Sequence, residues 1–359
     1  SVSITEGGNT ALIGANGADQ AKGAVYEFSR DGDEWEQQEK LVFDELKQKE
    51  QFGTSLAISN DGQTAFIGAP NVAVETSSGG VFGSGTNFST GAVYLLEKSQ
   101  NWQRIKDWYV RDTNTLFSPR FTANRPDYGE NSRKTGETAF GRSISLSNDG
   151  NTALIGAPED GNGSAYLVKQ NDSGWSHQNF SPEDADTDFG TSVSLSGDGT
   201  VSLVTAPDEL NSDGRETGAA YVINNRTGSR SRLTIEADTA NDQGTETIPI
   251  SGIGGGSGTI SSSGDIAVIN SEDNSPYLFA RIDGGWRQEQ ELKSENAEIG
   301  GEFGYETEFF DSESNILISD PFADDKGDVF SFKQESDKPA GGDPSESQGG
   351  TITPLISDN

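Results

Sequence analysis

One segment recurs along this chain, and this repetition limits the possible folds more than any other feature of the sequence. The clearest copy, residues 52–70, reads FGTSLAISNDGQTAFIGAP. Two close copies lie at 140–158 and 189–207, and a copy without its Phe-Gly lies at 1–15. Two weaker copies lie at 258–271 and 303–321. Regular self-similarity at about 50 residues predicts an architecture made of repeated structural units.

Each copy is followed by a third apolar run, and several copies also have a tryptophan at a nearly constant distance beyond it. The third runs lie at 23–28, 91–96, 163–168, 218–223, 275–280 and 327–332. The tryptophans that follow them are Trp35, Trp102, Trp175 and Trp286. Asp-Gly between two alternating runs is a strong hairpin signal, since glycine accepts positive φ. We therefore expect four strands in each unit, with a two-residue Asp-Gly turn between the first two.

A four-stranded antiparallel sheet buries both faces when it packs radially against its neighbours, as the blades of a propeller do. The sequence thus predicts an all-β fold, a β-propeller of four-stranded antiparallel blades. We count six blades, with seven as the alternative. The propeller should span residues 1–333, and residues 334–359 form a tail rich in Gly, Pro, Ser and acidic residues. The closing residues 351–356 either supply the strand missing from the last blade or lead into another domain.

The Phe-Gly and Gly-Ala-Pro residues of the copies carry a family resemblance. The chain resembles the FG-GAP repeats of integrin α-subunit propellers, and more closely their short prokaryotic versions. The resemblance covers roughly residues 1–333. It implies a propeller, usually of about seven blades, that is used outside the cell for adhesion or ligand binding.

One feature of the integrin repeats is missing here. Many of them hold calcium in a long loop between the first two strands, and calcium needs six to eight oxygen ligands. In this chain the corresponding segments are only Ser-Asn-Asp-Gly at 59–62 and 147–150, and Ser-Gly-Asp-Gly at 196–199. We therefore expect no metal in these loops and no cofactor elsewhere.

The chain is strongly acidic, with 58 carboxylates, 25 Lys and Arg residues and a net charge of −33. Such a surface repels phosphate backbones and anionic lipids, so we expect no nucleic acid partner and no membrane insertion. Self-repulsion of this size is screened by salt. A halophilic or marine origin is our preferred explanation, with an ordinary acidic protein as the alternative. We expect an extracellular or cell-surface location.

Three longer segments should emerge on one face of the propeller, at 71–90, 107–135 and 208–217, and long loops on a rigid scaffold often carry function. The segment 107–135 is basic and aromatic. Arg and large aromatic residues dominate binding hot spots, so we predict a protein or glycan ligand at Trp108, Tyr109, Arg111, Phe117, Arg120, Phe121, Arg125, Tyr128 and Arg133. The alternative is that the segment packs on its own blade, its aromatic residues forming a small core.

Catalysis has little support in the sequence. The chain has no cysteine and a single histidine, His177, so it can assemble neither a histidine-based triad nor a histidine-ligated metal site. Acidic clusters near residues 183–188, 208–213 and 320–328 could hold a cation, but solvated carboxylates are the simpler interpretation.

The first functional hypothesis is therefore a non-catalytic recognition or adhesion propeller. A structural subunit that assembles with copies of itself and a carbohydrate-active enzyme or its glycan-binding module are the alternatives.

Overall fold

The fold is known from a computed structural model. It describes residues 1–75, 87–112, 115–117, 138–182, 187–210, 217–233, 235, 257–271, 275–293, 304–310, 315–320, 328–333 and 351–354. The chain divides into two compact units, Ser1–Val193 and Ser194–Asn359, which we describe one after the other. Among the described residues, no helix is long and apolar enough to cross a membrane.

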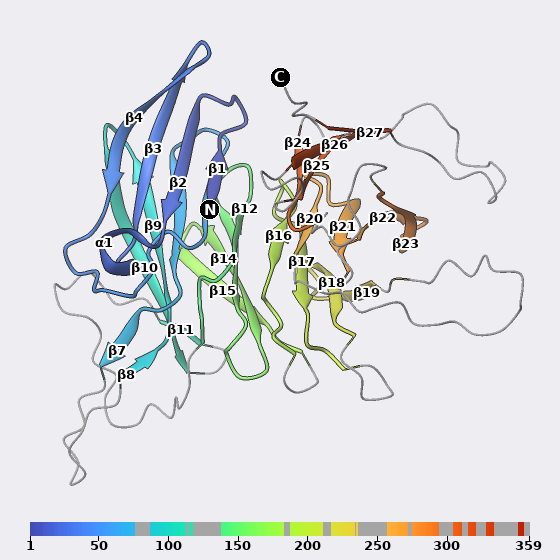
Figure 1. Ribbon diagram of the computed structural model, residues 1–359. Coiled ribbons are helices and arrows are strands. Elements are labelled where there is room, and N and C mark those ends of the chain that lie inside the picture. Colours follow the sequence, from blue (N-terminus) through green and yellow to red (C-terminus); the bar gives the residue numbers. More distant parts are fainter. Residues whose placement is uncertain are drawn as a thin grey trace, which may run out of the picture. The chain divides into compact units, whose positions relative to one another are not determined.

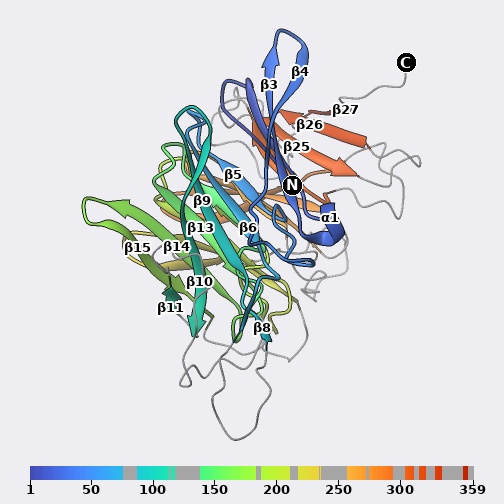
Figure 2. The same cartoon turned by 90° about the vertical axis from the view of Figure 1, so that its left-hand side faces the viewer.

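The first unit contains three blades whose strands follow one another in sequence order (Figure 1). Blade 1 consists of β1 (Val2–Ile4), β2 (Thr10–Ala15), β3 (Ala24–Asp31) and β4 (Glu34–Leu41). Blade 2 consists of β5 (Leu56–Ile58), β6 (Thr64–Ala69), β9 (Ala92–Lys98), β10 (Trp102–Asp112) and β11 (Thr115–Phe117). Blade 3 consists of β12 (Ile144–Leu146), β13 (Thr152–Ala157), β14 (Ser164–Asn171) and β15 (Gly174–Phe180). The β14–β15 hairpin projects outward (Figure 2).

Two small elements interrupt these blades. A two-stranded sheet, β7 (Ala73–Glu75) and β8 (Asn87–Ser89), lies between β6 and β9. The single turn α1 (Ala18–Ala21) lies between β2 and β3 and has left-handed dihedral angles at Asp19 and Gln20.

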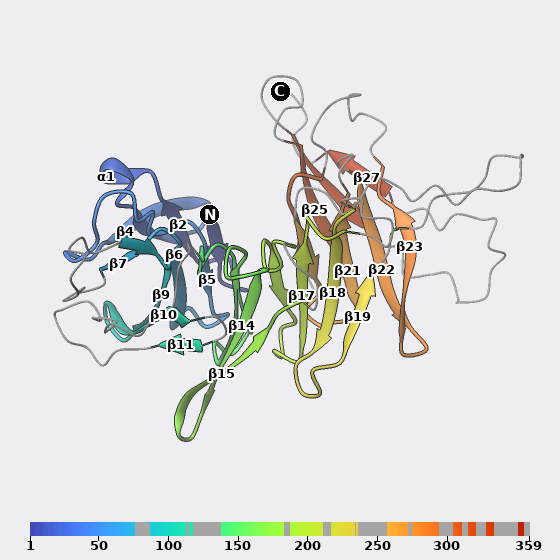
Figure 3. The ribbon, with the colours of Figure 1, turned by 90° about the horizontal axis from the view of Figure 1, so that it is seen from below.

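The other three blades make up the second unit, and here too sequential strands lie side by side (Figure 3). Blade 4 consists of β16 (Val193–Leu195), β17 (Val201–Ala206), β18 (Ala219–Asn224) and β19 (Arg230–Leu233). Blade 5 consists of β20 (Gly258–Ile260), β21 (Ile266–Asn270), β22 (Pro276–Ile282) and β23 (Gly285–Glu291). Blade 6 consists of β24 (Thr307–Phe310), β25 (Asn315–Asp320), β26 (Asp328–Lys333) and β27 (Thr351–Pro354).

The predicted fold class is confirmed: the protein is an all-β, six-blade propeller with four-stranded antiparallel blades and nearly no helix. Strand β27 pairs antiparallel with β26, from Lys333↔Thr351 to Phe330↔Pro354. Of the two alternatives for the C-terminal residues, the structure has the one in which they complete the last blade.

The turn between the first two strands differs from the prediction. Ser59 donates its N–H to Thr64 O at 2.9 Å, so four residues, not two, form the loop between them. A two-residue type I′ turn needs positive φ at both central residues, whereas in this loop only Gly62 has it, with φ 70°. The Ser59 hydroxyl donates to Asp61 Oδ1 at 2.6 Å and accepts the Thr64 N–H at 3.0 Å. The Ser-x-Asp-Gly pattern therefore forms a turn in which the aspartate carboxylate accepts a hydrogen bond from within the turn itself.

The Phe-Gly pair of each strong copy forms a tight turn where the chain enters a blade. Thr54 donates its N–H to Gln51 O at 3.1 Å, and Gly53 in between has φ 86°. Of the two central residues only the third of the turn has positive φ, and this, with the i to i+3 hydrogen bond, defines a type II turn, which favours glycine at that position. The same bond and the same glycine conformation occur at 139–142 and 188–191.

This turn also joins neighbouring blades. The Gly141 N–H donates to Gly156 O in its own blade at 3.0 Å, and the Gly141 carbonyl accepts the hydroxyl of Ser55, from blade 2, at 2.7 Å. A Cβ on Gly68 would lie 2.1 Å from Gly141 O. The glycines of Phe-Gly and Gly-Ala-Pro therefore meet backbone to backbone between blades 2 and 3.

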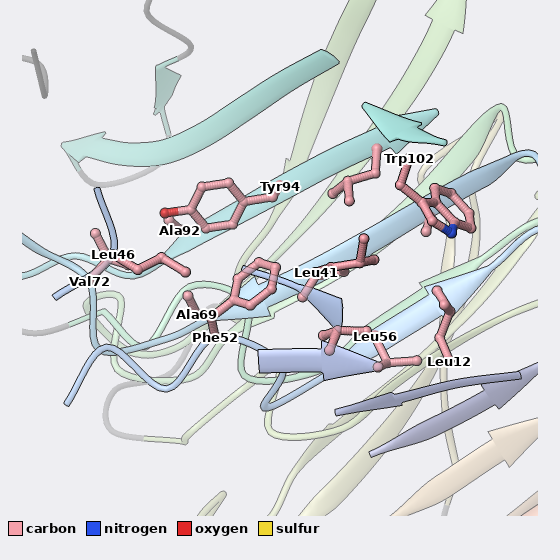
Figure 4. Packing of buried hydrophobic residues seen from close by; sticks show 14 of the residues in the cluster. Leu12, Leu41, Leu46, Phe52, Leu56, Ala69, Val72, Ala92, Tyr94 and Trp102 are labelled. Atoms are coloured by element: carbon pink, nitrogen blue, oxygen red, sulfur yellow. The ribbon is translucent and has the colours of Figure 1, made fainter. Parts of the chain in front are cut away.

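The hydrophobic core of the first unit lies between neighbouring blades. One cluster combines Leu12 and Val25 of blade 1 with Leu56 and Tyr94 of blade 2. Figure 4 shows Leu12, Leu56 and Tyr94 packed in one cluster with Phe52. The Phe52 and Tyr94 rings meet edge to face with centroids 5.3 Å apart. The repeated Phe and Tyr are thus core residues, as alternating runs on a packed blade require.

Candidate ligand-binding face of blade 2

Two inserts leave blade 2 at the same end of its sheet. Strands β6 and β10 both run antiparallel to β9, and the last residues of each that pair with β9, Ala69 and Trp108, lie opposite the adjacent residues Ala92 and Val93. The first insert follows β6 and the second follows β10. Their roots therefore lie together, at one end of a single rigid sheet.

The first insert is closed at its base by backbone hydrogen bonds. Both Thr90 and Gly91 donate their N–H groups to Val72 O, at 2.9 and 3.1 Å. Just beyond this closure, β7 and β8 pair from Ala73↔Ser89 to Glu75↔Asn87. The root of the insert is thus a short hairpin that continues from a buried anchor, since Val72 is fully buried.

The second insert begins as an extension of the blade. Strand β10 continues past the core, and β11 pairs back onto it, with Tyr109 opposite Phe117 and Val110 opposite Leu116. Strand β11 makes blade 2 the one blade with a fifth strand among the described residues. Figure 1 shows β7, β8 and β11 toward the same end of blade 2.

The two inserts return to the core at a shared point. The Thr138 hydroxyl, at the end of the second insert, donates a hydrogen bond to Thr90 O, at the end of the first, and both residues are buried. Next to them, Gly91 and Phe140 form a parallel bridge. This link fixes the roots of both inserts relative to each other.

Trp108 and Tyr109, the first two residues of the predicted ligand site, are buried on opposite sides of β10. The Trp108 ring stacks on Phe66 at 5.6 Å and meets Trp175 of blade 3 edge to face at 5.5 Å. Tyr109 lies in the cluster between blades 1 and 2 and donates its hydroxyl to Asp107 Oδ2 at 2.9 Å. Both side chains pack in the core, as in the alternative interpretation, and anchor the root of the second insert.

The remaining residues of the predicted site are less closely defined. Arg111 lies on β10 and Phe117 on β11. Five others lie outside the described residues; they are Arg120, Phe121, Arg125, Tyr128 and Arg133. Ligand contact by these seven residues stays a prediction.

Two cations of β10 also take part in packing, which the sequence pattern did not indicate. The Arg104 guanidinium lies 4.9 Å from the Phe43 ring centroid and pairs with Glu45. Lys106 Nζ lies 5.3 Å from the Trp108 ring centroid, and burial lowers the pKa of this lysine. A β-bulge between Arg104 and Lys106 places them on opposite faces of the strand, because an extra residue reverses the alternation.

A polar groove runs between the outer parts of blades 1 and 2. Its walls include Gln38 and Asn101, and at its base Lys98 forms an ion pair with the buried Glu27. Because the Lys98 and Glu27 charges pair with each other, the groups that remain available to a ligand in this groove are mainly amides and hydroxyls.

The acidic clusters have mixed roles. Glu209 is buried, its two carboxylate oxygens lie 2.7 and 2.6 Å from the Tyr221 hydroxyl and share its one proton, and it pairs with Arg232 Nε at 3.1 Å. In blade 3, the buried Asp160 likewise accepts the hydroxyl of Tyr166. These carboxylates stabilise the loop between the second and third strands. In the part of the chain that the structure describes, no group of three or more His, Cys, Asp or Glu residues could hold a metal ion.

The Tyr221–Glu209 pair leads to a pH-dependent prediction. Burial, together with the Glu209 carboxylate, raises the pKa of Tyr221 well above its usual value. The pair therefore stabilises the fold fully below the unfolded-state pKa of about 10 and loses that contribution as the pH rises toward the folded-state pKa. Tyr221→Phe should lower stability by about 1 kcal/mol at neutral pH, and the difference from wild type should shrink above pH 10.

Urea denaturation between neutral and alkaline pH checks this expectation. Tyr305→Phe is the control, because Tyr305 is exposed. A difference between wild type and Tyr221→Phe that stays constant with pH would contradict the role given to Glu209.

His177 lies on the outer strand β15 of blade 3, where its side chain is exposed. Partial burial lowers the pKa of its imidazole.

Comparisons with known proteins agree with the fold. No family model and no curated protein sequence matches the chain. Among solved structures, the Cps50 (Swd1) β-propeller domain of Myceliophteria thermophila matches with a TM-score of 0.56 and 11% identity, covering 98% of this chain and 84% of that chain. The periplasmic gluconolactonase PpgL of Pseudomonas aeruginosa matches with a TM-score of 0.52 and 13% identity, covering 99% and 84%. At these identities the likeness defines the class, a six-blade β-propeller, and nothing finer.

Proposed function

We propose that this chain is a non-catalytic recognition propeller of the FG-GAP type that acts outside the cell. It binds an anionic ligand through the inserts of blade 2. The observation that carries this proposal is the shared root of the two inserts, where Thr138 bonds Thr90 and Val72 closes the first insert. A rigid scaffold that presents two long segments at one place is a common arrangement for a binding site.

The chemistry of the second insert supports the ligand class. It carries Arg111, Arg120, Arg125, Arg133 and Lys134 in a chain whose net charge is −33. Four carboxylates, Asp107, Asp112, Asp127 and Glu130, accompany these five cations in the segment 107–135 and leave it a net charge of +1. Arginine pairs bidentately with carboxylate and sulfate-like groups, and a segment with an excess of cations in an otherwise acidic molecule favours an anionic partner locally. Acidic polysaccharides are the first ligands to test, and acidic protein surfaces are the next.

The FG-GAP assignment rests on the role of the repeated residues. Phe-Gly forms a type II turn whose glycine contacts the Gly-Ala-Pro segment of the preceding blade. The glycine of Phe-Gly in one blade leaves no room for a side chain at the glycine of Gly-Ala-Pro in the preceding blade. Intact repeats should therefore have glycine at both positions. This coupling gives a physical reason for the pattern that the integrin repeats share.

A triple variant, Arg120→Ala, Arg125→Ala and Arg133→Ala, should bind an acidic polysaccharide about tenfold more weakly than wild type or worse. Calorimetry over a panel of acidic and neutral polysaccharides measures the affinity, with turnover monitored in the same samples. Arg226→Ala is the matched control, because Arg226 is an exposed arginine in blade 4. Unchanged affinity of the triple variant would contradict the proposed surface, and any hydrolysis or elimination would overturn the non-enzymatic function.

A further inference from the structure

The outer strand of blade 3 differs chemically from the outer strands of the other blades. Strand β15 is seven residues long, GWSHQNF, and carries no formally charged residue at neutral pH. It pairs with β14 in unbroken register from Asn171↔Gly174 to Ala165↔Phe180. A long, regular and uncharged edge strand is a ready template for another strand.

Each of the other outer strands has a feature that blocks such pairing. Strands β4 and β23 contain bulges, at Gln38 and Glu289, and are rich in charged residues. Strand β19 has only four residues, two of them arginines. Strand β27 is equally short and ends in Pro354. Strand β10 has a bulge between Arg104 and Lys106 and several charged residues, and β11 pairs with its last residues. Bulges, charges, proline and short length are the usual protections of sheet edges, and β15 has none of them.

The hydrogen-bonding direction of β15 follows from its neighbours. Gln170 of β14 donates its N–H to Asn151 O on the β13 side. Because backbone groups alternate along a strand, Lys169 faces β15, and its carbonyl indeed accepts the Ser176 hydroxyl at 3.3 Å. Ser176 therefore faces β14.

The residues on either side of Ser176 face outward by the same alternation. Trp175, His177 and Asn179 each present a backbone N–H and a C=O at the open edge. Among the described residues, no hydrogen bond reaches these backbone groups. Figures 2 and 3 show the β14–β15 hairpin projecting from the first unit.

Blade 2 provides a precedent within the same chain. There, β11 pairs as a fifth strand with the end of β10, with Tyr109 opposite Phe117, just beyond the residues of β10 that pair with β9. A blade of this protein therefore accepts a further strand paired with its outer strand.

We propose that β15 is a docking edge for an extended, cationic polypeptide segment of a partner protein, which adds to blade 3 as a fifth strand. Main-chain hydrogen bonds to Trp175, His177 and Asn179 supply the pairing, as in other cases of β-augmentation. The net charge of −33 selects the partner, since it attracts a basic segment and repels a second copy of this chain. The proposal rests on β15 alone and does not depend on the proposed function.

The test uses a short synthetic peptide of alternating lysine and valine with blocked termini, titrated into the full chain and followed by fluorescence anisotropy. His177→Pro should weaken binding at least tenfold, because proline removes the central outward N–H. Proline is tolerated on edge strands where the lost donor faces outward. His177→Ala is the matched control: it removes the imidazole, keeps the N–H and should bind as wild type does.

A second measurement does not depend on how the proline variant folds. A peptide N-methylated at alternate backbone positions cannot donate to the β15 carbonyls and should bind at least tenfold more weakly than the unmodified peptide. Equal binding of both peptides, or equal binding by the His177→Pro and His177→Ala variants, would overturn the proposal. Tight binding of an alternating glutamate and valine peptide, or dimerisation through β15 in place of peptide binding, would overturn the assigned partner.

Discussion

Replacing Gly68 with alanine should lower the free energy of unfolding by about 3 kcal/mol or more, because the added methyl group has no room between blades 2 and 3. Its Cβ would lie 2.1 Å from Gly141 O and 2.4 Å from Ser55 Oγ. The carbonyl belongs to a type II turn that is already fixed by hydrogen bonds to Gly156 and Ser55. Relief of the clash must therefore move one blade away from the other and weaken the buried cluster between them.

The matched control is Gly17→Ala. Gly17 has ordinary right-handed dihedral angles, and no atom lies within 4 Å of an added Cβ. This substitution should change stability by less than about 0.5 kcal/mol, or stabilise slightly, because alanine restricts the unfolded chain. Urea denaturation followed by circular dichroism measures both variants. If Gly68→Ala proves as stable as Gly17→Ala, the close approach of the two blades is wrong.

The blades were predictable because their determinants are local. Alternating apolar residues around Ser-x-Asp-Gly specify two adjacent strands wherever the segment occurs, and the following Tyr run specifies a third. Even where the turn type was wrong, the strands were correct, since the loop that Ser59 and Asp61 close is compatible with the same hairpin. The copy that forms β20 and β21 has Ser263 in place of the aspartate and still forms the same loop, since the Ile266 N–H donates to the Ser261 hydroxyl at 3.1 Å and Gly264 has φ 77°.

The role of the motif glycines could not be derived from the sequence in the same way. Gly68 and Gly141 are 73 positions apart, and the contact between them exists only when two blades are assembled. A sequence pattern shows that glycine is present at both places. It does not show that the two glycines pack against each other and that a side chain on either would clash with the other.

The candidate site was predictable in its position along the chain and less so in its residues. The spacing of the copies reveals that blade 2 carries two inserts, but the end of β10 cannot be located by composition, because core and binding surface both favour aromatic residues. The bulge between Arg104 and Lys106 decides which of the following residues face which neighbour. A single inserted residue of this kind leaves no signal in an irregular segment, so Trp108 and Tyr109 appeared to belong to the loop.

Trp108→Ala should therefore lower the free energy of unfolding by about 3–5 kcal/mol, as expected for a residue whose role is structural. The Trp108 side chain is only 4% exposed and fills the space between Phe66 and Trp175, which come from different blades. Trp35→Ala is the control, because Trp35 is 42% exposed. Its removal should change stability by less than about 1 kcal/mol.

Measuring stability and ligand affinity on the same variants separates the two roles of an aromatic residue. If Trp108 only anchors the root of the second insert, its alanine variant, studied at a temperature where it remains folded, should lose stability first and lose affinity for an acidic polysaccharide only as the Thr138–Thr90 link loosens. The arginine triple variant should show the opposite pattern, with affinity lost and stability kept. A Trp108→Ala variant with wild-type stability and abolished binding would place this side chain on the ligand, and would show that the packing between blades 2 and 3 depends on other residues.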